Sequence, residues 1–227
     1  MHITICGGGN AAHTLAGLLS ALPEHQVKIY LSFQTELKQW QAGVQAQGGI
    51  LVRQEQDELI GQPEVIAGEP AHVVPGAQLI LLALPAFAHA SVLQEIAPYL
   101  DEGTWIGTLP ARGCFDLCAR QVLGEKYTQM VIFGLQTLPW ACRIQEYGRS
   151  VTILGTKASV DLAAWPAKHA QQIATYLGEA LDLQLEPVTN FLSLTLASTG
   201  QIIHPGVMYG LFHAWDGEPF NEAPLFY

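Results

Sequence analysis

The sequence predicts an α/β fold: a doubly wound, mostly parallel sheet with helices on both faces. Three observations support this. An apolar strand at residues 2–6 runs into a glycine-rich turn and then into an amphipathic helix. Further strands and helices alternate along the chain at the spacing of βαβ units. Residues 78–84, QLILLAL, are aliphatic without alternation, which is typical of a strand covered on both faces.

The glycine turn carries a dinucleotide-binding pattern. Gly7, Gly9 and Ala12 satisfy G-x-G-x-x-G/A between a strand and a helix. Gly7 permits the tight turn, Gly9 lets the backbone approach a pyrophosphate, and Ala12 keeps the helix close to the sheet. The free N–H groups at the helix start then face the phosphates. The expected cofactor contacts in this turn are Gly7, Gly8, Gly9, Asn10, Ala11 and Ala12, and a purely structural turn is the alternative.

Composition narrows the class of protein. Apolar residues make up 49% of the 227 residues and charged residues 13%, so the chain can bury a large core. The net charge of −10 argues against a nucleic-acid or anionic-membrane partner. No apolar run approaches the roughly 18 residues of a membrane span, and no signal segment precedes the first strand. We therefore expect a cytoplasmic protein.

The four cysteines do not indicate a metal site. They are Cys6, Cys114, Cys118 and Cys142, and their spacing contains no C-x-x-C pair. We expect reduced thiols and no bound metal.

The end of the second strand, residues 27–31, should discriminate between cofactors. An Asp or Glu usually grips the ribose 2′-OH there, but Ser32 occupies the tip, and Glu36 comes four residues later. No arginine is present for a 2′-phosphate, and the nearest base is Lys38. The residues leave NAD and NADP open. Ser32 could bond the ribose or cap the following helix, which runs through Leu37 and Trp40.

The loop after residues 78–84 should lie beside the glycine turn, at the switch point where open α/β sheets bind ligands. Pro85, Ala86 and Phe87 are therefore a candidate wall for the nicotinamide half, although Phe87 could equally be helix-start core. A helix is expected to follow from His89. Before this strand, residues 48–53 and 64–67 are expected strands around a solvated acidic loop at 54–58.

The remaining elements continue the alternation. We expect strands at 104–108, 130–135, 149–155 and 183–187, helices at 115–123 and 165–181, and a donor-rich loop at 137–143. From Thr189 the pattern becomes helical, with an interruption at 202–206. This predicts a dinucleotide-binding domain at 1–188, then a linker and the first helical part of an incomplete second domain at 189–227. The aromatic, proline-rich tail carries no terminating signal, so we expect a truncated chain.

Several ordered motifs resemble one known family. They are Cys6-Gly7-Gly8-Gly9-Asn10 with Ala12-His13-Thr14, Pro85-Ala86-Phe87-Ala88-His89, Thr137-Leu138-Pro139-Trp140-Ala141-Cys142-Arg143, Leu154-Gly155-Thr156-Lys157, His204-Pro205, and Trp215-Asp216-Gly217 through Glu222-Ala223-Pro224-Leu225-Phe226-Tyr227. Together they are similar to the nucleotide-binding part of the opine dehydrogenases, octopine type. The resemblance spans the whole chain.

This resemblance implies a Rossmann-like domain followed by a helical domain that closes over an amino acid. It implies NAD(P)H-dependent reductive condensation of an α-keto acid, usually pyruvate, with an amino acid. The octopine type uses NADH without an acid at the second-strand tip, which favours NAD here, with NADP not excluded. Because the acidic partner of the family's catalytic histidine lies in the missing domain, we expect cofactor binding with little or no turnover.

Four residues are the candidate reacting or substrate-binding groups. His204 is the candidate acid/base, because histidine as a residue type suits proton exchange near neutral pH. The His-Pro break should aim it outward, and it matches the family's His-Pro motif. Thr137 and Arg143 are candidate carboxylate contacts, although Arg143 could instead pair with Glu146. Arg112 departs from the family pattern of an uncharged amide, so it could grip the keto acid or a longer, more acidic one. The other histidines considered, except His89, are expected at the surface or in the core.

Two rival readings remain. One is a non-catalytic nucleotide-sensing module whose natural form is short. The other is a two-domain reductase of the ketopantoate or glycerol-3-phosphate type, which shares the glycine turn but is not expected to share residues 137–143.

Overall fold

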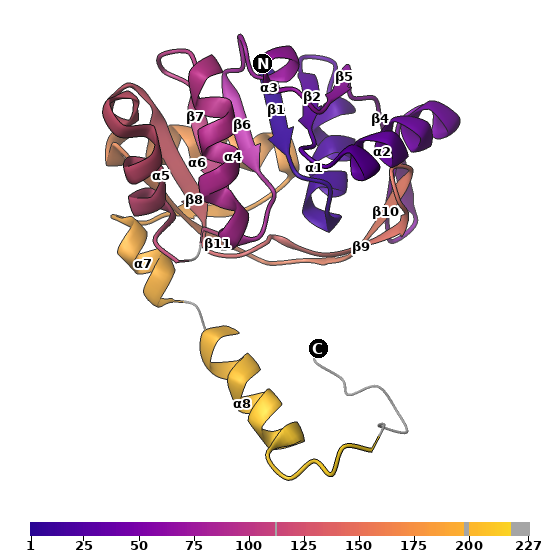
Figure 1. The fold of residues 1–227 in the computed structure, drawn as a ribbon, viewed down its shortest axis with the longest axis vertical. Helices are drawn as coiled ribbons and strands as arrows, with labels where there is room; N and C mark the ends of the chain where they lie inside the picture. The colour runs from indigo at the N-terminus through magenta and orange to yellow at the C-terminus, as the bar shows by residue number, and fades with distance from the viewer. Residues whose placement is uncertain (112, 198–199, 219–227) are drawn as a thin grey trace.

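A computed structural model describes residues 1–111, 113–197 and 200–218 (Figure 1). The strands are β1 (His2–Cys6), β2 (Gln26–Tyr30), β3 (Ile50–Gln54), β4 (Asp57–Gly61), β5 (Val65–Ala67), β6 (Leu79–Leu82), β7 (Trp105–Thr108), β8 (Val131–Leu135), β9 (Trp140–Glu146), β10 (Ser150–Thr156), β11 (Val160–Trp165) and β12 (Leu185–Pro187). The α-helices are α1 (Asn10–Ser20), α2 (Gln34–Gln47), α3 (Pro70–Val73), α4 (His89–Ile96), α5 (Phe115–Leu123), α6 (Ala170–Leu181), α7 (Phe191–Leu196) and α8 (Gly200–Phe212). Short 3₁₀ turns cover Ala86–Ala88, Ala97–Tyr99, Gly124–Gln129 and Ala167–His169.

The large sheet is a doubly wound sheet, as predicted. Its eight strands lie in the order β12-β11-β8-β7-β6-β1-β2-β5. Every neighbouring pair is parallel except β11 with β8. The run from β5 to β8 is the 3-2-1-4-5-6 order of a Rossmann-like fold, and its switch point lies between β1 and β6. A ligand crevice is therefore expected at the carboxyl ends of these two strands.

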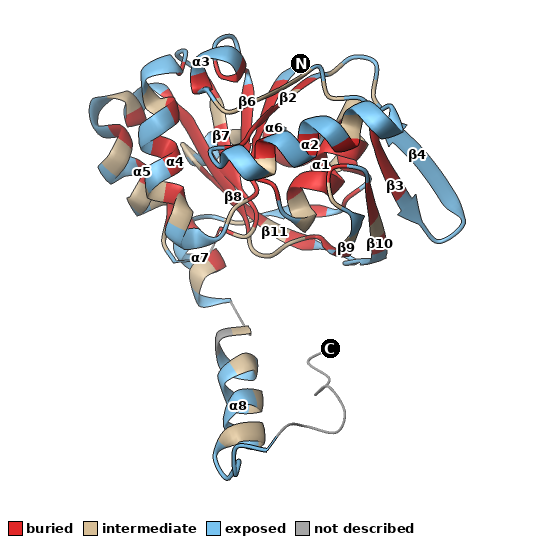
Figure 2. Ribbon diagram, turned by 45° about the vertical axis from the view of Figure 1, so that its right-hand side comes forward, coloured by how far each residue is buried: buried red, intermediate tan, exposed pale blue. Residues whose placement is uncertain are grey.

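The apolar runs form central strands because both faces of this sheet are covered. Leu79 and Leu81 pack into one core with Ile5, whereas Ile80 and Leu82 pack into the other. This two-residue alternation between two cores explains why β6 shows no polar positions. Figure 2 shows the buried strands enclosed between helices whose outer faces are exposed.

A second, smaller sheet covers α1 and was not expected from the sequence. Its strands lie in the order β4-β3-β10-β9. Glycines allow it to approach α1 closely: a Cβ on Gly17 would lie 2.2 Å from a methyl group of Val52, and one on Gly61 would lie 2.0 Å from the Gly17 carbonyl oxygen. Figure 1 shows β9 and β10 running along the bottom of the large sheet toward this position.

Three expected boundaries are wrong, all involving antiparallel strands. Asp57 and Glu58 begin β4 rather than lying in a solvated loop, and Glu58 pairs with Arg53 at 2.7 Å. The donor-rich loop at 137–143 is short, since β9 starts at Trp140. The expected helix at 165–181 starts only at Ala170, after β11. Strands with one exposed face alternate polar and apolar residues and resemble loops in sequence.

The C-terminal part is helical, but the expected interruption at 202–206 is wrong. α7 is capped by the Asn190 side chain, which accepts a hydrogen bond from the Ser193 N–H at 3.1 Å. α8 continues through Pro205, because a proline removes one helical hydrogen bond without preventing the turns on either side. Figure 1 shows α8 standing apart from the large sheet.

Across the residues that the structure describes, no helix has the length and apolarity that crossing a membrane requires.

Candidate cofactor and substrate site

The first glycine of the turn is fixed by its backbone. Gly7 has φ +126°, which side chains rarely adopt, and its N–H donates to the Tyr30 carbonyl oxygen at 3.1 Å. A Cβ there would lie 2.5 Å from the Ala83 carbonyl oxygen. The turn is therefore closed against the ends of β2 and β6, and only glycine fits.

The next part of the turn is open. Gly9 is the N-cap of α1, is exposed, and a Cβ at this position would meet no atom within 4 Å. No side chain caps the helix, so its first-turn N–H groups are available to an anion. The open approach and the helix end lie together at the switch point, where a pyrophosphate would bind. Ala12 is buried, as its role against the sheet requires.

The loop after β6 is presented at the same edge. Pro85 precedes a 3₁₀ turn that contains Ala86 and Phe87. The side chain of Phe87 is 89% exposed, so the alternative that it belongs to the core is wrong. An exposed aromatic ring at this edge of the sheet is compatible with a wall for a planar ligand.

His89 ties this loop to the end of β7. Its Nε2 lies 3.2 Å from the Leu84 carbonyl oxygen and 3.1 Å from the Thr108 hydroxyl. The Thr108 hydroxyl donates its own hydrogen to the Leu82 carbonyl at 2.9 Å, so Nε2 carries the hydrogen that the other two oxygens accept. Burial lowers the pKa of His89, and the ring is a neutral donor that holds two ligand-edge loops together.

The structure brings the 137–143 run to the glycine turn. The Asn10 side-chain oxygen accepts a hydrogen bond from the Ile144 N–H at 2.8 Å, which joins the start of α1 to β9. Thr137 is half-buried in the loop before β9. Arg143 is exposed, next to the joined residue, and its guanidinium donates to the Cys142 carbonyl at 2.9 Å.

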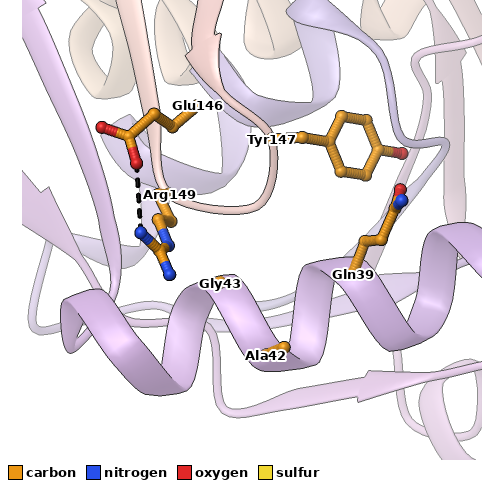
Figure 3. Close-up of a pocket in the computed structure, with 6 residues that line it drawn as sticks. All are labelled: Gln39, Ala42, Gly43, Glu146, Tyr147 and Arg149. Atoms are coloured by element: carbon orange, nitrogen blue, oxygen red, sulfur yellow. Dashed lines mark hydrogen bonds and ion pairs between the residues drawn. The ribbon is translucent and has the colours of Figure 1, made fainter.

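The alternative ion pair of Arg143 with Glu146 is wrong. Glu146 pairs with Arg149 at 3.1 Å across the β9–β10 turn, beside a hollow on α2 (Figure 3). Residues three apart on a strand point to opposite faces, which separates Arg143 from Glu146. The Arg143 side chain is therefore not engaged by that carboxylate.

A buried histidine next to the turn was missed from the sequence. His13 Nδ1 donates to the Gly9 carbonyl oxygen at 3.0 Å, and Nε2 accepts from the Gly148 N–H at 2.8 Å. Its ring contacts Trp40, with ring centroids 4.2 Å apart. Burial lowers the pKa of His13 to about 4. Its position four residues after Gly9, on the buried side of α1, was the available signal.

At the end of β2, Ser32 does not cap the following helix. α2 begins at Gln34 with Phe33 at the N-cap and no side-chain cap, so capping by Ser32 is wrong. Ser32 is exposed, and its contact with a ribose stays a prediction. Glu36 lies in the first turn of α2 and reaches back to the glycine turn: a Cβ on Gly8 would lie 2.8 Å from its Oε2.

The structure does not bring His204 to these groups and does not place Arg112. Arg112 lies outside the described residues. His204 is half-exposed on the continuous helix α8, so the expected helix break does not aim it. Within the described ranges, no group of His, Cys, Asp and Glu could hold a metal, and the four cysteines are free thiols.

Comparison with known proteins identifies relatives along the entire chain. No family model matches. The octopine dehydrogenase of Mizuhopecten yessoensis is 36% identical over 236 residues, which cover 100% of this chain and 58% of that protein. The tauropine dehydrogenase of Arabella iricolor is 31% identical over 237 residues, which cover 99% of this chain and 59% of that protein.

The chain is similar over its whole length to opine dehydrogenases. An octopine dehydrogenase solved with NADH and L-arginine superposes with a TM-score of 0.85 at 32% identity, covering 99% of this chain and 57% of that one. A yersinopine dehydrogenase with bound NADP⁺, at 19% identity and a TM-score of 0.76, shares the fold. The chain therefore spans a little under three fifths of the length of these opine dehydrogenases.

Proposed function

We propose that this chain is the cofactor-binding part of an NADH-dependent opine dehydrogenase, which condenses an α-keto acid such as pyruvate with an amino acid and reduces the product. Residues 1–188 would form the dinucleotide-binding domain, and 189–227 the linker and first helical part of the substrate domain. One observation carries the proposal: the open, uncapped N-terminus of α1 lies at the switch point of a chain that resembles NADH-bound octopine dehydrogenase throughout.

The residues of the turn fit a dinucleotide. The backbone of Gly8, Gly9, Asn10 and Ala11 would hold the pyrophosphate, with Gly7 and Ala12 keeping the turn close to the sheet. Pro85, Ala86 and Phe87 would border the nicotinamide half across the crevice. Ser32, exposed at the end of β2, would lie on the adenosine side. The open space beside Gly9, where a Cβ would meet no atom within 4 Å, supports the close approach of a pyrophosphate to this backbone.

The reaction also needs groups that exchange protons and bind two carboxylates. NADH, when bound, supplies the hydride for the imine carbon. His204 would give and take protons as the keto oxygen leaves as water. Thr137 and Arg143 would bind a substrate carboxylate, because Asn10 holds β9 against the start of α1. Arg112 would bind the keto-acid carboxylate.

His204 works with an acidic partner in the family's helical domain, so the 227-residue chain alone should bind cofactor with little turnover. The cytoplasm is the proposed compartment, because four free thiols suit a reducing environment.

Calorimetric titration of the purified chain with NADH tests the proposal. Binding in the micromolar range is expected, together with negligible NADH oxidation when pyruvate and arginine are added. Absence of any binding heat would overturn the cofactor assignment. Oxidation at ordinary enzyme rates would overturn the claim that the catalytic site is incomplete.

A further inference from the structure

Two polar side chains converge on Gly8, the buried middle glycine of the turn. A Cβ built on Gly8 would lie 2.6 Å from the Tyr147 hydroxyl and 2.8 Å from Glu36 Oε2. Tyr147 comes from the β9–β10 turn and Glu36 from the first turn of α2. Residues distant in sequence thus place a carboxylate and a phenol against the turn that a dinucleotide must cross.

The carboxylate is that of Glu36, at the N-terminus of α2. Glu36 is half-buried at the N-terminus of a helix, where the dipole stabilises negative charge. It is also on the β2 side of the turn, where the adenosine half of a dinucleotide binds. The nearest base in sequence, Lys38, lies two residues on and therefore about 200° around the helix, on an exposed face. The side of α2 that faces the turn is consequently acidic.

The phenol is that of Tyr147, whose buried hydroxyl has no hydrogen-bond partner among the described residues. The Tyr147 hydroxyl lies near Trp40 and Glu36 but makes no hydrogen bond of good geometry with a described residue, although the oxygen is buried. Burial, reinforced by Glu36, raises the pKa of Tyr147 to about 12, so the group remains a donor. Figure 3 shows the ring pointing along α2, away from Arg149 and toward Gln39. Its backbone neighbour Gly148 is fixed by His13.

The chemistry of this pair selects between two cofactors. A carboxylate only accepts hydrogen bonds, and a ribose diol offers two donors. A 2′-phosphate offers none when ionised and brings further negative charge against Glu36. We propose that Glu36 recognises the adenosine ribose hydroxyls of NADH and excludes NADPH, with Tyr147 as the fixed donor beside it. This inference rests on the proposed cofactor-binding function and would let a chain without an acid at the β2 tip discriminate between the two cofactors.

The test is calorimetric titration of the 227-residue chain with NADH and, separately, with NADPH. The wild type, Glu36→Gln and Glu36→Lys are compared, with Glu102→Gln as a control that removes the same charge from an exposed turn before β7. Circular dichroism melting establishes that each variant is folded. We expect the wild type to prefer NADH by about tenfold or more.

Glu36→Gln should reduce that preference by about tenfold, Glu36→Lys should reverse it, and Glu102→Gln should leave it unchanged. An equal affinity of the wild type for both cofactors, or an unchanged preference in folded Glu36→Gln and Glu36→Lys, would overturn the role of Glu36. A wild type that binds neither cofactor would instead overturn the proposed function, so the two failures are distinguishable.

Discussion

At the scale of single residues, the glycine turn depends on the protonation state of His13 and on the absence of a side chain at Gly7. His13 must stay neutral, because Nε2 accepts from the Gly148 N–H and a protonated ring has no acceptor. Gly7 must stay without a side chain, because its φ and the nearby Ala83 carbonyl exclude one. Both residues fix the turn without any need to touch a ligand, and each gives a distinct prediction.

The first prediction concerns pH. The pKa of His13 is about 4 in the folded chain against 6.5 in its unfolded reference, so the unfolded chain binds the proton more readily between these values. The stability associated with neutral His13 is therefore complete above pH 6.5 and is lost as pH falls toward 4, by roughly 3 kcal/mol. Urea unfolding from pH 4 to pH 8 measures this slope. His13→Gln should flatten it, whereas His72→Gln, at an exposed histidine, should not. An identical slope in His13→Gln would show that another group titrates.

The second prediction concerns Gly7→Ala. The methyl group would meet a backbone oxygen at 2.5 Å in a conformation unsuited to alanine. We expect a loss of at least ~2 kcal/mol in the free energy of unfolding, together with loss of NADH binding. Urea unfolding provides the first quantity. Wild-type stability in this variant would mean that the turn is looser than described.

At the scale of elements, most parallel strands of the large sheet were predicted, and so were β3 and β10 of the small sheet, whereas β4, β9 and the antiparallel β11 were missed. β6 is a continuous aliphatic run because both its faces are covered, and the sequence marks it directly. β9 alternates buried Trp140 and Cys142 with exposed Ala141 and Arg143, so its polar members suggested a loop. The helices α1, α5 and α6 were predicted because their buried faces recur at helical spacing.

Only part of the candidate site could be predicted from the sequence. The glycine turn and the loop after β6 follow from local patterns. The contacts of His13 with Gly148, of Asn10 with Ile144, and of Glu36 and Tyr147 with Gly8 join residues that are distant in sequence. The contacts of Gly148, Ile144 and Tyr147 depend on the small sheet packing on α1, and that of Glu36 depends on the position of α2. No local pattern encodes this packing. Pro205 led to a wrong prediction of a break in the helix, because α8 continues through this proline.

The third prediction concerns the connection between α1 and β9. Asn10→Ala leaves the partly buried Ile144 N–H without its acceptor, which should cost about 1–3 kcal/mol. Asn10→Asp keeps an acceptor oxygen and should recover most of that stability, while its charge weakens NADH binding at the helix start. Urea unfolding and calorimetry together measure both effects. Equal stability of Asn10→Ala and the wild type would show that this hydrogen bond does not stabilise the fold.

At the scale of the whole molecule, the compact sheet domain and the C-terminal helices differ in burial. The core residues of the sheet are enclosed, whereas several apolar side chains of the last two helices are exposed. They are Leu192, Leu196, Ile202, Ile203, Met208 and Tyr209. Exposed apolar side chains favour association in water, and the aromatic tail positions Phe220, Phe226 and Tyr227 lie outside the described residues.

The fourth prediction is that the 227-residue chain self-associates through this surface. Size-exclusion chromatography with light scattering should show a mass that rises with concentration. The double variant Ile202→Gln, Ile203→Gln should shift the population toward monomer without altering the sheet domain. A monomer at every concentration would contradict the prediction.

The uncapped start of α1 is the proposed binding site of NADH, and substitution of Gly9 tests it directly. Gly9→Ala adds a methyl group that meets no protein atom within 4 Å and sits at a backbone φ of −83°, which alanine adopts freely. The same methyl group would occupy the space through which a pyrophosphate approaches the helix. Calorimetric titration of wild type and Gly9→Ala with NADH should therefore show micromolar binding by the wild type and at least about tenfold weaker binding by an equally stable variant. Equal affinities would place the cofactor elsewhere and contradict the account.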